Sequence, residues 1–370
     1  MKRKCKNIYI TNYDFIRSSV TDCLAHKRNR QMNRKDIKTI FEKYNDVDGV
    51  TAMIQSELIN RKLDLDPIRY KTIIDRGNGK ERNIAIEGIH QQFLDYVASH
   101  ALMQGIGSYI GHYQIACRKG CGSIMASHLV QNWIKDKKSR YCIKADLRHC
   151  YESITHADME KWLKKHVNNE PLLWLIHQLL GTVREGLPIG SMLSITLSAL
   201  YIADLYHRIE DHYFLTRRGK KTHVIAHQLF YLDDIYLFGS NAKELHKAMK
   251  DITTHASSMG LTIKPDWITI CLNKTAVPVL GYRVREDRIT MVRKNYLAVK
   301  KSLRKFKREP NDKNARSLNS YWGMLKYSNS KKFCEKYNVY AVMRSARKVV
   351  SLHDKGKFYG QTAGSKNHEN

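Results

Sequence analysis

A run of apolar and aromatic residues surrounds two adjacent acidic residues in the second half of the chain. The apolar stretch leads up to them over 229–232 and continues after them over 235–238. Two apolar runs of strand length, joined by a polar pair, predict a β-hairpin in a buried sheet. The hairpin places Asp233 and Asp234 at its tip.

Other stretches predict the remaining elements. Alternating segments within 66–86 flank Gly77-Asn78-Gly79, which predicts a second hairpin. A short strand is expected at Tyr141–Ala145, ending at Asp146. Apolar spacing predicts helices over 33–44, 192–209 and 241–260, and 88–135 is expected to be largely helical. This mixture of helices and strands indicates an α+β fold.

The composition indicates the class of partner. The chain has 64 Lys and Arg against 35 Asp and Glu, a net charge of +29. Because the basic residues are spread along the whole chain, they favour a long groove for a nucleic-acid backbone over a single anchoring patch. A basic protein without a polyanionic partner is the alternative.

The 370 residues suffice for a sizeable core and for two or three lobes. The sequence contains no run of about 18 or more apolar residues, so no membrane span is expected. No signal-peptide stretch follows the basic start, so a cytoplasmic protein is expected. The eight cysteines lack the paired spacing of a zinc site and are expected to be free thiols.

The two adjacent aspartates are candidate ligands for a cation. Neighbouring carboxylates on a buried turn repel each other unless a cation shares them, and hard oxygen ligands suit Mg²⁺. A phosphoryl-transfer site with two ions about 3.5–4 Å apart needs a further carboxylate. Asp146 is the candidate. The alternative is an ordinary Asp-Asp turn between two strands.

Three motifs in order carry a resemblance to a known family. They are Asp146 followed by Tyr151, the turn Gly-Leu-Pro-Ile-Gly-Ser at 186–191, and Tyr-Leu-Asp-Asp at 231–234. Over residues 61–350 the chain resembles a prokaryotic reverse transcriptase of the group II intron-like superfamily. The resemblance implies a right-hand polymerase with fingers, a palm with an antiparallel sheet, and an α-helical thumb. The implied divisions are a basic helical extension at 1–60, fingers at 61–140, palm at 141–295, thumb at 296–352 and a disordered tail at 353–370.

The resemblance also implies the reaction, in which a primer 3′-hydroxyl attacks the α-phosphate of a deoxynucleotide. Asp146, Asp233 and Asp234 are then the catalytic carboxylates that hold two Mg²⁺ ions, and the backbone carbonyl of Leu147 completes the metal shell.

Further residues are expected to bind the nucleotide. Lys80 and Arg82 are expected on its triphosphate, where a guanidinium suits bidentate contact; a solvated basic hairpin is the alternative. Tyr151 is expected to exclude a 2′-hydroxyl by its volume, and Ile189 with Gly190 to shape the base-pair pocket. Core packing is the alternative for both Tyr151 and Ile189.

Nucleic-acid contacts are expected at three places. The turn with Arg118 and Lys119 resembles a template contact, and a plain surface turn is the alternative. The strand around Gly281 and Tyr282 resembles the primer grip. A basic helix is expected to follow the duplex phosphates, or else to be merely solvated. Its outer face includes Lys300, Lys301 and Arg304, and its inner face Tyr296, Leu297, Leu303 and Phe306. The 1–60 extension is expected to touch RNA or to cap the fingers.

Two positions depart from the usual family pattern. Most reverse transcriptases have Gln where this chain has Ile189, and an apolar residue there resembles the enzymes of diversity-generating retroelements, which copy template adenines unfaithfully. That branch usually continues Ser-Gln, whereas here Ser194 is followed by Ile195. The family often has lysine where Trp267 stands. Its role as a proton donor to pyrophosphate is then absent or shifted to Lys264.

Several biological roles remain open. The first is a retroelement enzyme that makes error-prone cDNA from a cognate structured RNA, and the second an anti-phage defence enzyme that copies its own non-coding RNA. A group II intron maturase is disfavoured because little chain follows the thumb. A non-catalytic RNA-binding scaffold is the alternative from another class. The expected partners are RNA template, DNA primer, deoxynucleotides, the cognate RNA, and a small basic accessory protein or a second copy of this bacterial or phage-encoded chain.

Overall fold

The computed structural model describes residues 3–27, 29–74, 79, 81–116, 118, 120–210, 213–215, 219 and 221–364. The chain forms two compact units, which are described separately. The first contains Met1–Arg118 and Ile143–Thr269, and the second Lys119–Cys142 and Ile270–Asn370. These units cross the predicted lobes, since 119–140 of the predicted fingers and 270–295 of the predicted palm belong with the second unit.

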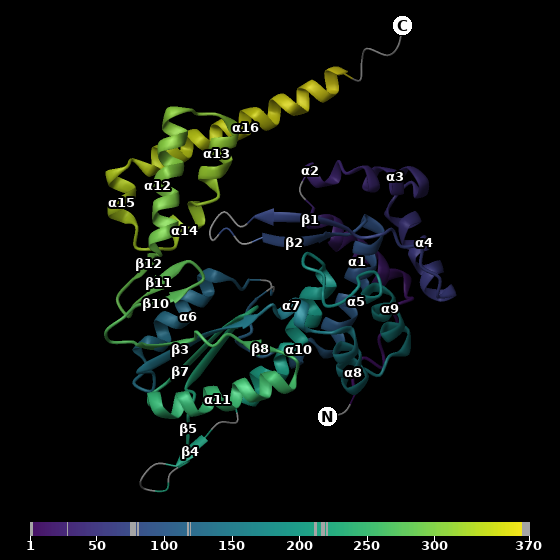
Figure 1. The fold of residues 1–370 in the computed structure, drawn as a ribbon. Coiled ribbons are helices and arrows are strands. Elements are labelled where there is room, and N and C mark those ends of the chain that lie inside the picture. Colours follow the sequence, from purple (N-terminus) through teal and green to yellow (C-terminus); the bar gives the residue numbers. More distant parts are fainter. Residues whose placement is uncertain are drawn as a thin grey trace. The chain divides into compact units, whose positions relative to one another are not determined.

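Helices make up most of the first unit (Figure 1). They are α1 (Tyr13–Ala25), α2 (Asn29–Met32), α3 (Lys35–Tyr44), α4 (Val47–Asn60), α5 (Ile89–Ile106), a 3-10 turn (Gly107–Tyr109), α7 (Cys150–Ser153), α8 (His156–His166), α9 (Glu170–Leu180), α10 (Met192–Glu210) and α11 (Ala242–Ser258). Helix α5 is buried around most of its circumference, including Phe93 and Val97, and packs against α1, α9 and α10. The helices predicted over 33–44, 192–209 and 241–260 are confirmed to within two residues at each end.

The central sheet has the strand order β6-β7-β3-β8. Its strands are β3 (Tyr141–Arg148), β6 (His227–Tyr231), β7 (Asp234–Gly239) and β8 (Thr262–Ile263). Strand β9 (Ile268–Cys271) also pairs with β3, and the division between the two units passes through both strands. Helix α11 packs against β7 and β8, as Figure 1 shows.

Two separate hairpins complete the first unit. One is formed by β1 (Arg69–Ile74) and β2 (Glu81–Ile86), which are antiparallel and confirm the predicted hairpin in 66–86. Residues 77–78 of its turn lie outside the described residues. The other is formed by β4 (Tyr213–Leu215) and β5 (Lys221–His223). Both hairpins and the β6–β7 pair of the central sheet are antiparallel. The fold is therefore mixed α+β with antiparallel sheets, as predicted.

The second unit combines a small sheet with a helical bundle. Its helices are α6 (Ser123–Lys135), α12 (Arg293–Arg308), α13 (Asp312–Asn319), α14 (Trp322–Lys326), α15 (Lys331–Lys336) and α16 (Val339–Gly364), and its sheet pairs β10 (Val277–Val279), β11 (Tyr282–Val284) and β12 (Ile289–Met291). The bundle core includes Val299, Leu303 and Phe306 of α12. Leu297, predicted on this inner face, is 51% exposed, so that prediction is wrong.

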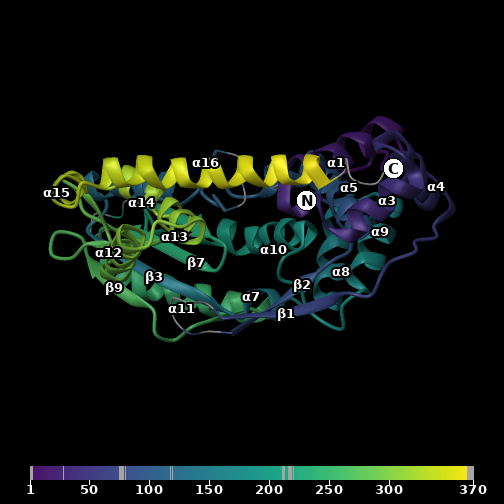
Figure 2. The same cartoon turned by 90° about the horizontal axis from the view of Figure 1, so that it is seen from above.

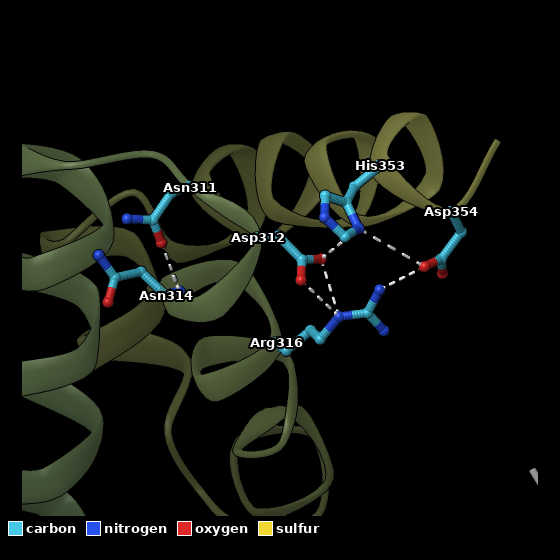
Figure 3. Close-up of polar contacts among 6 residues, drawn as sticks. All are labelled: Asn311, Asp312, Asn314, Arg316, His353 and Asp354. Carbon is cyan, nitrogen blue, oxygen red and sulfur yellow. Dashed lines mark hydrogen bonds and ion pairs between the residues drawn. The ribbon is translucent and has the colours of Figure 1, made fainter. Parts of the chain in front are cut away.

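Helix α16 corrects the predicted chain end. It continues to Gly364 as one helix, which Figure 2 shows along its length, so the disordered tail predicted for 353–370 is wrong over 353–364. Polar contacts tie its far part to α13 (Figure 3). The guanidinium of Arg316 pairs with Asp354, and the imidazole Nδ1 of His353 lies 3.6 Å from a carboxylate oxygen of Asp312.

Two further observations concern the described residues alone. Their cysteines are free thiols, as predicted. Among the same residues, no helix combines the length and apolar character that crossing a membrane requires.

Candidate active site

The hairpin that carries the two adjacent aspartates is confirmed. Strands β6 and β7 are antiparallel, and Tyr231 lies opposite Asp234 in their register. Leu232 and Asp233 therefore form a two-residue turn, in which Leu232 has a φ of 54°. The side chains of Phe230 and Ile235 behind the turn are buried, which fixes its position.

Asp146 lies beside this turn. The strand that carries it runs on to Arg148, further than predicted, because Leu147 and Arg148 pair with β8. The backbone N–H of Leu147 donates to the Asp233 carbonyl oxygen over 2.9 Å. This bond holds the two parts of the chain in register, so Asp146, Asp233 and Asp234 are brought together. Leu147 itself is buried.

Burial and mutual repulsion raise the pKa of Asp233 and of Asp234. The pKa of Asp233 is raised by burial and by the charge of Asp146, while Lys264 and Arg82 oppose the rise. The pKa of Asp234 is raised mainly by burial, and Lys144 opposes it. A site with these properties stabilises additional positive charge.

Two lysines already supply part of that charge. The ammonium group of Lys264 pairs with the Asp146 carboxylate. The Nζ of Lys144 lies 3.4 Å from an oxygen of Asp234 and 5.6 Å from the ring centre of Tyr236. Sequence reasoning missed Lys144, although its spacing of two from Asp146 along a strand places both on one face.

The donor set fits magnesium in its chemistry. The three aspartates offer hard oxygen ligands in a partly buried setting where cations are favoured. However, no three acidic, histidine or cysteine side chains of the described residues are close enough to hold one ion. The ammonium groups of Lys264 and Lys144 lie against the Asp146 and Asp234 carboxylates, where a bound cation would compete with them.

The fingers hairpin contributes a cation near the carboxylates. Arg82 lies on β2 opposite Ile73, is exposed, and acts on the charge of Asp233. This places its positive charge near the site, which is consistent with its predicted role. Lys80 lies outside the described residues.

The turn at 186–191 is attached to the same hairpin. The backbone N–H of Ala85 on β2 donates to the Ile189 carbonyl over 2.9 Å. Gly190 has a φ of 115°, and a Cβ there would lie 3.1 Å from the Ala85 carbonyl oxygen, so the turn packs closely against β2 at this glycine. Tyr151 of α7 accepts a bond from the Leu187 N–H through its carbonyl, over 2.9 Å. The turn is thus attached by backbone hydrogen bonds to α7 at Tyr151 and to β2 at Ala85.

Sequence reasoning missed two acidic residues beneath this turn. Glu87 and Asp95 are only 4% and 1% exposed, and Asp95 accepts a hydrogen bond from Ser191 over 2.5 Å. Acidic residues are rarely buried, so the sequence alone gave no reason to place them in the core.

The predicted template contact has a local role. The guanidinium of Arg118 donates to the carbonyl oxygens of Gly111 and His112, over 3.3 and 3.0 Å, and orders its own loop. Lys119 lies outside the described residues.

The predicted primer and duplex contacts lie in the second unit. Gly281 lies in the turn between β10 and β11, so the single strand predicted there is instead a hairpin. The carbonyl oxygen of Gly281 accepts a hydrogen bond from the side-chain amide of Asn295. Tyr282 on β11 is buried. Lys300 lies over the ring of Tyr337, 5.5 Å from its centre. Lys301 and Arg304 are exposed on α12.

Comparison with known proteins identifies the family. Residues 73–284 match the family model described as reverse transcriptase (RNA-dependent DNA polymerase). Over 296 residues the chain is 22% identical to the "Putative COX1/OXI3 intron 1 protein" of Saccharomyces cerevisiae. The match covers 64% of this chain and 35% of that relative, so the chain spans about a third of the relative's length. The family match covers more than half of the chain and includes Asp146, the 186–191 turn and the Asp233-Asp234 hairpin, so this chain belongs to the reverse transcriptase family.

Proposed function

We propose that this protein makes cDNA from a cognate structured RNA by two-metal nucleotidyl transfer, and that it copies the RNA with errors. The observation that carries the proposal is the position of Asp146 beside the Asp233-Asp234 turn, fixed by the bond from the Leu147 N–H to the Asp233 carbonyl. Three carboxylates that lie together inside the matched family segment are what a two-metal site requires.

Each group has a role in this reaction. Asp146, Asp233 and Asp234, with the Leu147 carbonyl, would hold two Mg²⁺ ions, which when bound supply charge stabilisation for phosphoryl transfer. Arg82 binds the triphosphate by charge-assisted bonds, and Lys80 is proposed for the same role. Tyr151 excludes the 2′-hydroxyl.

Each unit contains residues that are proposed to contact nucleic acid. Arg118 and Lys119 are proposed to contact the template. The turn at Gly281 and Tyr282 is proposed to hold the primer end, and Lys300, Lys301 and Arg304 the duplex phosphates. The bundle that carries these three cations has 17 Lys and Arg against three Asp and Glu over residues 293–352, which supports a polyanionic partner.

Ile189 supports the error-prone character. Its apolar side chain offers no hydrogen bond at a position where most members of the family carry glutamine. At this position the pocket then distinguishes a correct base pair from an incorrect one by shape alone. Such a site discriminates more weakly than one built to hydrogen-bond its substrate.

Primer extension tests the proposal directly. Purified protein receives an RNA template, a DNA primer, Mg²⁺ and all four deoxynucleotides, and the products are sequenced. The control is Asp233→Asn with Asp234→Asn, which keeps the shape of both side chains and removes their charge. Extension that this variant loses supports the polymerase. Extension that it retains contradicts the assignment of these residues.

The error frequency of the sequenced products separates the candidate biological roles. For a retroelement enzyme we expect errors concentrated at template adenines, and we expect Ile189→Gln to lower their frequency. Faithful copying that Ile189→Gln does not change would favour a defence enzyme that copies its own RNA. No extension on any template, in the presence of co-purified RNA, would favour the non-catalytic scaffold.

An intron-encoded enzyme is a second candidate. The similarity to the yeast intron protein favours it, because that relative's name places it in an intron. An enzyme of this kind is expected to bind its own intron RNA in preference to other structured RNA. Equal affinity for unrelated RNA of the same length would count against this candidate.

A further inference from the structure

The turn at Ile189-Gly190 rests on a buried polar cluster. The hydroxyl of Ser191, the next residue, donates to an Asp95 oxygen over 2.5 Å and accepts from the Ser194 N–H over 3.2 Å. Asp95 belongs to α5, the buried helix of the first unit. Ser191 is therefore the link between the turn and the core, and its position depends on Asp95.

Glu87 lies against Asp95 in the same cluster. It is 4% exposed, and its Oε1 has no hydrogen-bond partner among the described residues. The pKa of Glu87 is raised by burial, by the charge of Asp95 and by a hydrogen bond with it. A buried carboxylate with an unsatisfied oxygen is far more costly than a neutral acid, so the pair holds one proton.

The titratable groups around Glu87 and Asp95 come from several elements. Lys27, which follows α1, donates to the Gln92 amide oxygen and opposes the raised pKa of Glu87. The Cys23 thiol of α1 and the Tyr96 hydroxyl of α5 are kept neutral by burial, with their pKa values raised to about 11 and about 12. Among the residues that the structure describes, no lysine or arginine side chain forms an ion pair with either carboxylate, so a proton shared by the two acids is the main source of neutralisation.

The N-terminal segment braces the backbone at Glu87. The guanidinium of Arg34 donates to the Glu87 carbonyl over 2.9 Å and pairs with Asp36. Asp36 in turn accepts from the Ile89 N–H over 2.9 Å. Residues 34–36 therefore clamp the peptide that connects β2 to α5, immediately after the strand that bonds to Ile189.

We propose that Glu87 and Asp95 are positioning residues for nucleotide binding, which hold the Ile189-Gly190 turn in place through Ser191. Neither residue touches the substrate. Two attachments define the turn, one from Ala85 to Ile189 and one from Ser191 to Asp95. This inference rests on the proposed function, because the turn is assigned to the nucleotide pocket there.

Kinetics of primer extension at neutral pH test the inference. Glu87→Gln keeps a neutral side chain of the same shape, so its KM for deoxynucleotide should stay within about twofold of wild type. Glu87→Ala removes the side chain, and Ser191→Ala removes the link; both should raise KM by about tenfold with kcat changed less than threefold, the signature of lost binding rather than lost chemistry. A Glu87→Gln variant as impaired as Glu87→Ala, or kcat losses that exceed the KM changes, would overturn the proposal.

A second measurement is independent of activity. Removing the Ser191 hydroxyl takes one hydrogen-bond donor away from the buried Asp95 carboxylate, so Ser191→Ala should lower the thermal midpoint more in the wild-type background than in Asp95→Asn. Additive losses would show that the two residues are not coupled, and would overturn the proposal whatever the activity. Coupled losses in a protein that fails to extend primers would leave the cluster intact and reject the polymerase assignment instead.

Discussion

The ammonium group of Lys264 pairs with the Asp146 carboxylate, and the backbone N–H of Lys264 donates to the Asp146 carbonyl oxygen over 2.9 Å. One residue thus fixes the strand that carries a catalytic candidate and covers its charge. A lysine in this position competes with any cation that the carboxylate binds.

Lys264→Ala should therefore strengthen magnesium binding. The half-saturating Mg²⁺ concentration in primer extension should fall by about two- to fivefold, which corresponds to the loss of one partly exposed ion pair. Lys250→Ala, an exposed lysine on α11, is the control and should leave it unchanged. An unchanged magnesium requirement with a reduced kcat would instead place Lys264 on the reacting groups.

Gly190→Ala should damage nucleotide binding. The φ of 115° is costly for any side chain, and the new Cβ would lie 3.1 Å from both the Ala85 carbonyl oxygen and the Ile84 Cγ2. The combined strain is about 1–3 kcal/mol, so kcat/KM for deoxynucleotide should fall by about 10- to 100-fold. Gly122→Ala is the matched control, because nothing lies within 4 Å of its Cβ and its backbone is extended. Comparable losses in both variants would show that the effect is not local to the turn.

The spacing of apolar residues was sufficient to predict the helices and strands that bury one regular face. The Asp233-Asp234 hairpin and the α10 and α11 helices follow from the apolar pattern alone. Tertiary contacts decided the rest. The exposed Leu297 depends on which face of α12 the later helices cover, and the turn at Gly281 depends on the pairing of β10 with β11.

The candidate site shows the same division. Asp146 was predicted from a strand and two motifs. The Leu147 bond to Asp233 places it beside the turn, and its catalytic role stays a prediction. Glu87 and Asp95 could not be found, because acidic residues in a sequence are normally assigned to the surface. Their burial depends on how α5 packs in the first unit, which no spacing of residues reveals.

Arg316→Ala should loosen the far part of α16. The Nε of Arg316 donates to both Asp312 oxygens, over 2.8 and 3.0 Å, and its guanidinium also pairs with Asp354 (Figure 3). Without the guanidinium, two carboxylates of like charge remain close together. Amide hydrogen exchange over 350–356 should rise by about two- to tenfold, while the rest of the bundle keeps its protection, because exposed ion pairs contribute little to global stability. Arg344→Ala, an exposed arginine on the same helix, should leave the exchange of that segment unaltered. Unchanged exchange in Arg316→Ala would mean that packing alone extends α16.

Glu87→Gln should change how the stability of the protein depends on pH. The pKa of Glu87 is raised from 4.5 to about 9 in the folded protein. Between these values the folded state keeps a proton that the unfolded state releases, so the free energy of unfolding falls as the pH rises through this window. The stability linked to this group is complete below about pH 4.5 and lost by about pH 9, with a limiting slope of about 1.4 kcal/mol per pH unit.

Glutamine does not ionise, so the variant lacks this slope. Its free energy of unfolding, measured by urea titration, should exceed that of wild type by an increasing amount from about pH 6 to pH 9. Glu42→Gln, at an exposed position on α3, is the control and should follow the wild-type curve. Parallel curves for Glu87→Gln and wild type would mean that Glu87 is already ionised in the folded protein. Asp95 would then have to be the group that keeps the proton, because two adjacent buried carboxylates cannot both carry a charge without a cation beside them.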